Sequence, residues 1–183
     1  VAAVPFSELR VKDTWHTVGM RGTGSNLVVG QDVFVPDHRV LRLADAITGS
    51  ALMPTVLTYM IGPYLGMAAA ALDHVMAHAG KRPVSFTTHQ RQSDSPAFQI
   101  AIAEATAKID VARLLARSCA EAVSGAVPDY AARARHRLHF AHAVRQCGEA
   151  LDVLVAAHGA AAVAESSPLN VLLRDMQTAL RHA

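Results

Sequence analysis

Apolar residues recur alternately four and three positions apart between residues 140 and 158, and this spacing restricts the fold more than any other feature. The stripe consists of Phe140, Val144, Cys147, Leu151, Leu154 and His158. Alternating steps of four and three put side chains on one face of an α-helix, as a seam that packs against neighbouring helices. Asp129 is a good N-cap before the helix, and Gly159 ends it. The segment is predicted to be one long helix of a bundle.

Three further segments have helical periodicity with capping residues at their ends. One helix is expected over residues 53–79, with a kink at Gly62–Pro63. A second begins at Ser95–Pro96 and ends before Gly125, and the last runs from about Ser167–Pro168 to the end of the chain. Ala, the best helix former, is the commonest residue. The predicted fold is therefore mostly α-helical, an up-down four-helix bundle.

The first forty residues differ in kind. Residues 8–12 alternate between charged and apolar side chains, and residues 27–29 and 33–35 are runs of mainly β-branched and aromatic residues. Two or three strands are therefore expected. Such a small sheet is not stable alone and needs other elements to pack against. We therefore divide the chain into residues 1–42, the end of a β-domain, and residues 43–183, a helical bundle domain.

Charge and cysteine usage indicate a cytoplasmic protein that does not bind nucleic acid. A net charge of +2 is too small to indicate a nucleic-acid partner. Cys119 and Cys147 lack CxxC spacing and lie in apolar helices, so we expect buried, reduced thiols in a reducing cytoplasm. No basic segment precedes an apolar run at the N-terminus, so no signal peptide is expected. The absence of an initial Met indicates a fragment.

Residues 46–72 carry no charge, and this stretch is long enough to span a bilayer by the roughly 20-residue criterion. Prolines, glycines and hydroxyl residues dilute its hydrophobicity, and no basic flank precedes Asp73 and His74. We expect a buried helix and no membrane association.

His74 and His78 stand four residues apart on one helix face, a spacing that lets two imidazoles share a metal ion. The segment lacks the Glu of an H-E-x-x-H motif, and the sequence indicates no third ligand. The preferred interpretation is an exposed or hydrogen-bonded pair at a helix C-terminus, with no metal.

Basic residues crowd the start of the helix that follows Pro128. Arg133 and Arg137 extend its apolar stripe, and Arg135 and Arg145 lie on the same helix. This face could bind phosphate or a nucleotide, but a solvated face, or one paired with carboxylates of a neighbouring element or subunit, is the interpretation we prefer.

Residues 19–25, Gly-Met-Arg-Gly-Thr-Gly-Ser, lie between two expected strands and open no helix. They are therefore no dinucleotide-binding loop, and on physical grounds they form a tight strand connection. His182 is a candidate acid or base near physiological pH, against the alternative that it is frayed surface.

Several segments together resemble one family. They are residues 13–25 (DTWHTVGMRGTGS), 32–39 (DVFVPDHR), 95–105 (SPAFQIAIAEA), 109–115 (IDVARLL) and 166–175 (SSPLNVLLRD), continuing to His182. In this order the segments are similar to the acyl-CoA dehydrogenase superfamily, and their residues most resemble those of its two-component flavin-dependent monooxygenase branch. The resemblance implies that residues 1–42 end the family's middle β-domain, and that the chain is the C-terminal half of a longer protein.

The resemblance also implies site residues. Acyl-CoA dehydrogenases need a carboxylate base, and neither of the family's two positions for it holds an acid here. His182, eight residues after Arg174, matches the histidine of the monooxygenase branch and is expected to be catalytic. The cofactor contacts implied by the resemblance are Arg21, Ser25, Arg39, Gly159 and Arg174.

The function implied by the resemblance is hydroxylation of an aromatic or other small hydrophobic substrate with O2 and reduced FMN or FAD, supplied by a separate flavin reductase. The family's bundles also imply a homo-oligomer, a tetramer. Ala160–Ala162 replace a glycine-rich turn, and residues 81–86 replace an Arg-rich Phe-Gly stretch. Weaker flavin binding fits an enzyme that borrows reduced flavin, and it fits a degenerate fragment equally. The alternatives are an acyl-CoA dehydrogenase-like flavoprotein and an inactive fragment that acts only in assembly.

Overall fold

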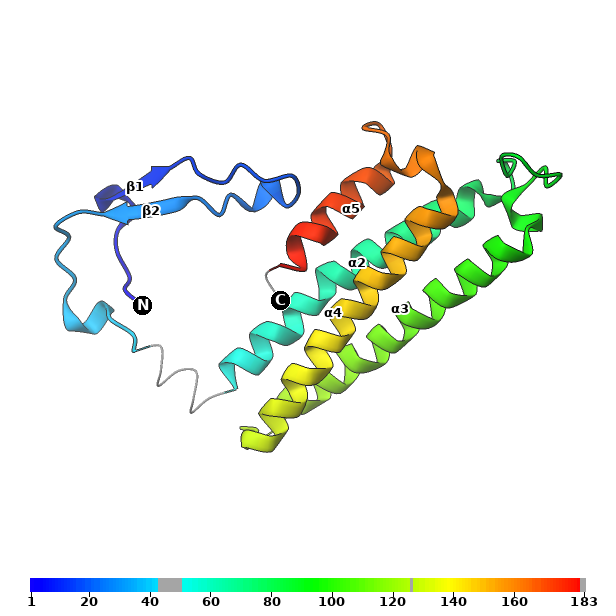
Figure 1. The fold of residues 1–183 in the computed structure, drawn as a ribbon. Helices are drawn as coiled ribbons and strands as arrows, with labels where there is room; N and C mark the ends of the chain where they lie inside the picture. The colour runs from blue at the N-terminus through cyan, green and yellow to red at the C-terminus, as the bar shows by residue number, and fades with distance from the viewer. Residues whose placement is uncertain (43–50, 126, 182–183) are drawn as a thin grey trace.

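Four helices form the body of the chain in a computed structural model that describes residues 1–42, 51–125 and 127–181. They are α2 (Leu52–Ala79), α3 (Pro96–Val123), α4 (Tyr130–His158) and α5 (Pro168–Ala179). Successive helices run in opposite directions, with the shorter α5 returning along α2 and α4 (Figure 1). The predicted up-down bundle is confirmed.

Local signals set the helix ends almost as expected. The Asp129 carboxylate accepts a hydrogen bond from the Ala132 amide at 2.8 Å, and so caps α4. Gly159, with φ of 83°, ends that helix. α2 runs without interruption through Pro63. The last helix is predicted to run to the end of the chain, but α5 ends at Ala179, and Leu180 and Arg181 form a turn.

The core lies where the apolar stripe of α4 meets α2 and α3. All six residues of the predicted stripe are buried: Phe140, Val144, Cys147, Leu151, Leu154 and His158. Cys119 and Cys147 are buried free thiols, as predicted. Burial raises the pKa of Cys147 to about 12, so this thiol is unreactive at neutral pH.

The β-part is a single hairpin. β1 (Leu9–Lys12) pairs antiparallel with β2 (Leu27–Gly30), with Leu9 opposite Gly30 and Lys12 opposite Leu27. The possible third strand at residues 33–35 does not form, because within the described chain no segment lies alongside it to share a ladder. The predicted boundary between residues 42 and 43 falls at the edge of the described residues and stays a prediction.

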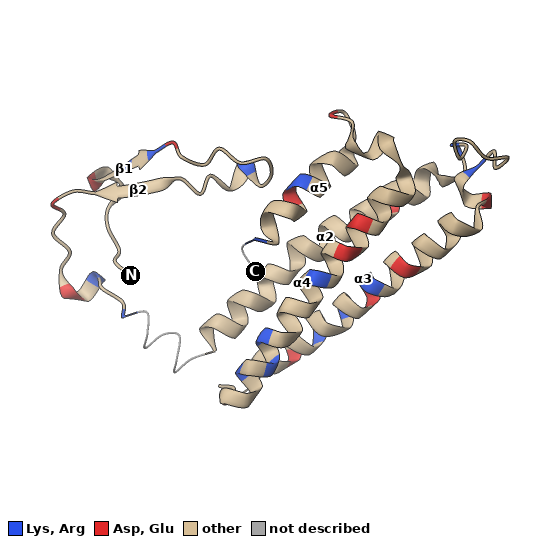
Figure 2. Cartoon of the chain, viewed as in Figure 1, with Lys and Arg blue, Asp and Glu red and all other residues tan. Residues whose placement is uncertain are grey.

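α2 is buried along one side only, so the prediction of a buried helix holds for its inner side and not for its outer side. Its inner side includes Ile61, Tyr64, Ala68 and Val75. Its outer side leaves apolar residues exposed, and Figure 2 shows this helix almost free of charge. By length and composition α2 could cross a membrane, a property that the core helix of a soluble bundle shares. Residues 46–50 of the charge-free stretch lie outside the described residues.

Candidate functional site

The turn between the two strands docks onto the C-terminal half of α5, as Figure 1 shows. Gly19 is buried there, and a Cβ on it would lie 2.1 Å from the Arg174 carbonyl oxygen. Only glycine allows this approach. Met20 follows with φ of 53°, and its amide donates a 2.6 Å hydrogen bond to the Asp175 carboxylate. The resembling segments near the two ends of the chain therefore meet in space.

Hydrogen bonds inside the turn orient Trp15. The indole Nε1 donates to the Met20 carbonyl at 3.0 Å, and the Asn26 side-chain oxygen accepts from the Trp15 amide at 2.9 Å. Thr23 Oγ1 also donates to the Met20 carbonyl, at 2.7 Å. The indole is thus held half-buried against the turn.

A cavity of about 240 Å³ lies between this turn, α2 and α5. We call it the turn cavity; it is lined by Trp15, Met20, Thr23, Ser25, Met60, Pro63, Tyr64, Thr178 and Ala179. The Tyr64 hydroxyl donates to the Ala179 carbonyl at 2.8 Å, which ties α2 to the end of α5. Burial raises the pKa of Tyr64, so its hydroxyl stays a donor at neutral pH.

The polar side-chain groups of the turn cavity are four hydroxyls and the Trp15 indole N–H, and most of their protons are already donated to backbone carbonyls. Thr23, Tyr64 and Thr178 each donate to a backbone carbonyl, the last to Arg174 at 2.9 Å. Their oxygen lone pairs remain free to accept. No carboxylate is among the described lining residues. The cavity therefore suits a flat apolar ring that carries N–H or O–H donors at its edge.

The structure places the predicted site residues unevenly around this cavity. Ser25 lines it, Arg21 lies exposed in the turn, and Arg174 contacts Gly19 through its carbonyl while its side chain is exposed. Arg39 is exposed in a short 3-10 helix beyond β2, and Gly159 lies at the C-terminal end of α4, before the chain enters α5. His182, the predicted catalytic residue, lies outside the described residues.

Sequence reasoning assigned no role to Trp15, Asp175 or Tyr64. Trp15 and Asp175 stand inside the resembling segments, so the resemblance offered a signal for both. Nothing in the sequence around Tyr64 distinguishes it from an ordinary helix residue.

The His74–His78 pair meets a third imidazole. His158 at the end of α4 lies with its ring centroid 5.4 Å from that of His74, and the His78 ring lies 4.4 Å from His74. Arg82 Nη1 lies 2.5 Å from His158 Nε2. Burial, together with the charges of Arg82 and the two histidines, lowers the pKa of His158 to about 4. A guanidinium in this position repels a cation, and no group suited to a metal ion occurs among the residues that the structure describes.

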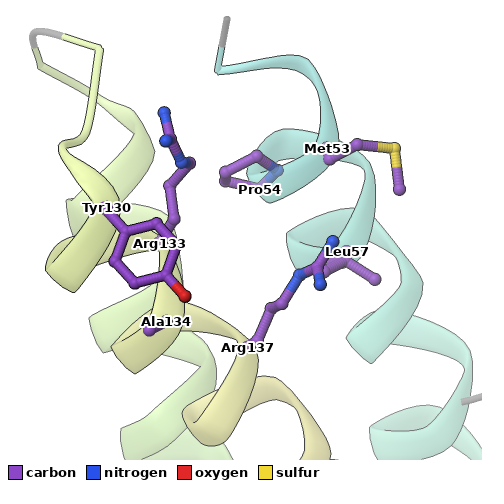
Figure 3. A pocket seen from close by; sticks show the side chains of 7 residues that line it. All are labelled: Met53, Pro54, Leu57, Tyr130, Arg133, Ala134 and Arg137. Carbon is purple, nitrogen blue, oxygen red and sulfur yellow. The ribbon is translucent and has the colours of Figure 1, made fainter. Parts of the chain in front are cut away.

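A second cavity, of about 300 Å³, opens between the first turns of α2 and α4 (Figure 3). We call it the arginine cavity; it is lined by Met53, Pro54, Leu57, Tyr130, Arg133, Ala134 and Arg137. Arg133 Nη1 donates to the Pro128 carbonyl at 3.2 Å. Within the described ranges neither arginine forms an ion pair, and Arg137 is exposed, so of the two interpretations preferred above the structure agrees with the solvated face.

Comparisons with known proteins agree with this arrangement. The oxygenase subunit HsaA of a flavin-dependent monooxygenase from Rhodococcus jostii (strain RHA1) is 35% identical over 98% of this chain and 52% of its own length. The oxygenase component of an FADH(2)-dependent resorcinol hydroxylase from Rhizobium sp. (strain MTP-10005) is 33% identical over 65% of this chain and 34% of its own. The chain thus spans about half the length of HsaA. The match to the hydroxylase covers a smaller share of that relative's length.

Among solved structures, XiaF from Streptomyces sp. in complex with FADH2 and glycerol superposes on the whole chain with a TM-score of 0.91 at 36% identity. The match covers 50% of the XiaF chain. A family model described as acyl-CoA dehydrogenase, C-terminal domain, matches residues 59–183. Since that match includes α3, α4, α5 and most of α2, the chain belongs to the acyl-CoA dehydrogenase family through its C-terminal domain.

Proposed function

We propose that this chain is part of the oxygenase component of a two-component flavin-dependent monooxygenase. It would use reduced FMN or FAD from a separate flavin reductase, together with O2, on an aromatic or other small hydrophobic substrate. The observation that carries the proposal is the turn cavity. It is built from the Trp15–Ser25 turn and the end of α5, the same segments that resemble the family. The HsaA relative from Rhodococcus jostii, which matches 98% of this chain, is the oxygenase subunit of a flavin-dependent monooxygenase. XiaF, which superposes on the whole chain, was solved in complex with FADH2.

The residues of the turn cavity fit part of a flavin. Trp15, Met20 and Met60 supply apolar walls for a planar ring, and the lone pairs of Thr23 and Ser25 can accept from ring N–H groups. A volume of about 240 Å³ is below the roughly 300–1,000 Å³ usual for whole ligands, so the cavity takes a ring and not an entire cofactor. Arg21, exposed in the same turn, is proposed to bind the phosphate side.

Bound reduced flavin would supply the electrons that activate O2. The chain's own residues would hold the ring and exclude water. Trp15 and Met20 cover the cavity from the turn, and the Tyr64 hydroxyl holds the end of α5 against α2. Water exclusion matters because reduced flavin exposed to solvent passes its electrons to O2 without oxygenating a substrate. Arg39, Gly159 and the Arg174 side chain remain proposed cofactor contacts outside the cavity.

His182 is proposed to position or exchange a proton on the substrate. It follows Ala179, a lining residue, by three positions in the sequence. A dehydrogenase would instead need a carboxylate to remove a proton from its substrate, and the described lining of the cavity contains none. This difference favours the monooxygenase over the acyl-CoA dehydrogenase-like alternative.

Anaerobic titration of the 183-residue chain with reduced FMN and reduced FAD tests the proposal, with Trp15 fluorescence and flavin absorbance as readouts. We expect saturable binding that Ser25→Leu weakens, because leucine would block the cavity. After mixing with O2, His182→Ala should shorten the lifetime of the oxidising flavin species, whereas His38→Ala, at an exposed site in the β-part, should not. Tight binding of oxidised FAD that acyl-CoA reduces would contradict the proposal, and so would the absence of reduced-flavin binding.

We further propose that the chain assembles as a homo-oligomer, a tetramer, in the cytoplasm. Leu52, Val56 and Tyr59 lie on one face of the outer side of α2 and are exposed, and Tyr59 is 78% exposed. Apolar side chains gathered on one helix face favour association. Light scattering after size exclusion measures the mass directly, and Tyr59→Glu is expected to reduce it. A wild-type chain that stays monomeric at micromolar concentration would refute this part of the proposal.

A further inference from the structure

The arginine cavity is separate from the site proposed above. It shares no lining residue with the turn cavity, although both rest on α2. Figure 3 shows Arg137 extending from α4 toward Leu57 of α2, and Arg133 rising beside Pro54. We propose that this cavity binds a small organic anion, a carboxylate or phosphate group on an aromatic or short aliphatic body.

The first argument is that the arginines at the start of α4 form no ion pair with any carboxylate of the described residues. Arg133, Arg135 and Arg137 lie in the first eight residues of α4, and no acidic residue occupies its first turn. Figure 2 shows this basic cluster at the start of the helix. The macrodipole makes a helix N-terminus positive, so cations there are unfavourable. The carboxylate of Asp129, the N-cap, accepts a hydrogen bond from the Ala132 amide and forms an ion pair with none of the described arginines. A bound anion would offset this excess charge.

The shape of the cavity is the second argument. Pro54, Leu57 and Met53 form an apolar wall from α2, opposite the two guanidinium groups of α4. Ala134, a small residue, lines the cavity together with Arg133 and Arg137. Its volume of about 300 Å³ matches the lower end of small-molecule pockets. An inorganic anion would leave the apolar wall exposed to water, and a neutral ring would leave the guanidinium groups without a negatively charged acceptor. A ligand with both parts satisfies both sides.

Arginine suits this role better than lysine would, because its guanidinium can bind carboxylate or phosphate through two parallel hydrogen bonds. Arg133 keeps one Nη1 contact to the Pro128 carbonyl, and Arg137 has no hydrogen bond to any described residue. Tyr130 adds a phenol at the rim, where it is 81% exposed and can close over an aromatic ligand. Donors for an anion are therefore available without breaking an existing ion pair.

Isothermal titration of the 183-residue chain with phenyl phosphate tests the inference, with inorganic phosphate and phenol as the two partial probes. We expect phenyl phosphate to bind at least about tenfold more tightly than either partial probe. Arg137→Gln and Arg133→Gln should each weaken binding about tenfold. Arg135→Gln removes the same charge from an exposed position outside the cavity and should change it less than about twofold. Cyclohexanecarboxylate in place of phenyl phosphate distinguishes a carboxylate site from a phosphate site.

Ala134→Leu keeps both arginines but fills the cavity, and should abolish binding of phenyl phosphate. All four positions are at least partly exposed, so these variants should fold, and circular dichroism verifies this. Equal effects of Arg135→Gln and Arg137→Gln would overturn the inference, because binding would then follow net charge alone. Equal affinity for phosphate and phenyl phosphate, or unchanged binding in Ala134→Leu, would do the same. Reduced-flavin binding is measured in the same variants and should not change, which separates this site from the proposed flavin site.

Discussion

Gly19→Ala should release the turn from α5 while the helical bundle stays folded. The added Cβ would lie 2.1 Å from the Arg174 carbonyl oxygen and 2.7 Å from the Asp175 amide nitrogen. Both atoms are backbone of a helix and cannot give way, so the turn must move by about 1 Å or more. A shift of that size breaks the 2.6 Å hydrogen bond between the Met20 amide and the Asp175 carboxylate.

The expected loss of docking free energy of the turn on α5 follows from the loss of that hydrogen bond. A hydrogen bond to a charged group contributes about 1.5–3 kcal/mol, which corresponds to a factor of roughly 10–150 in the population of the docked turn. The fully buried apolar core contains no residue of the turn, and Met20 only packs against it from outside, so the free energy of unfolding of α2 to α4 should change little. The affinity for reduced flavin should fall by up to the same factor, because binding then requires redocking.

Trp15 makes the assay direct, because it is the chain's one tryptophan and lines the turn cavity. In Gly19→Ala its fluorescence should shift to longer wavelength and become more accessible to acrylamide. Gly22→Ala is the matched control, since a Cβ on Gly22 meets nothing within 4 Å. Wild-type fluorescence and flavin affinity in Gly19→Ala would refute the role assigned to this contact, and a similar response in Gly22→Ala would refute its specificity.

Three further predictions concern stability. Burial lowers the pKa of His158 from 6.5 to about 4 in the folded chain, so the unfolded chain binds more protons between these values and stability falls as the pH drops from 6.5 toward 4. Between pH 7.5 and 4.5 linkage makes this loss about 2–3 kcal/mol, and urea unfolding of His158→Gln should show a flatter pH dependence; an unchanged dependence would exclude His158 as its source. Lys108 and Arg145 hold the pKa of Glu149 at about 2, so its contribution is present above pH 4.5 and lost toward pH 2. Glu149→Gln should cost about 1 kcal/mol at pH 7, because this is a partly exposed network, and 1 M NaCl should shrink the difference. Asp129→Ala should destabilise the chain by about 1 kcal/mol in thermal unfolding, whereas Asp129→Asn keeps the cap and should not.

Local signals made the helices predictable. The stripe from Phe140 to His158 has a single period, and Asp129 and Gly159 mark its ends by capping chemistry that acts within a few residues. The four-helix bundle follows from such patterns because each stripe must be buried against another. Of the two or three strands predicted, two form, and the possible third at residues 33–35 is absent from the described chain for the opposite reason. A strand exists only through its partner, and β-propensity says nothing about whether the described chain supplies one.

The candidate site was predictable only in part. Ser25 and the Arg174–Asp175 pair could be named from the resembling segments, but their meeting joins Met20 to Asp175 across 155 residues. Tyr64 enters the site because α2 packs beside α5, and His158 joins His74 and His78 because α4 ends where α2 ends. Long-range contacts of this kind depend on how the helices pack. The sequence pattern predicts which face of a helix is buried, but it does not predict which residue of another helix that face will contact.

Both cavities rest on the first half of α2, and the ligands proposed for them differ in chemistry. α2 supplies Met53 to Leu57 to one cavity and Met60 to Tyr64 to the other, and no charged residue occurs in this stretch. The polarity of each cavity is therefore set by the element opposite α2. The turn contributes hydroxyl oxygens, which suit a neutral ring with donors, and α4 contributes guanidinium groups, which suit an anion. Because the polar groups lie on separate elements, Ser25→Leu and Arg137→Gln should act independently, and their effects on the two ligands should add.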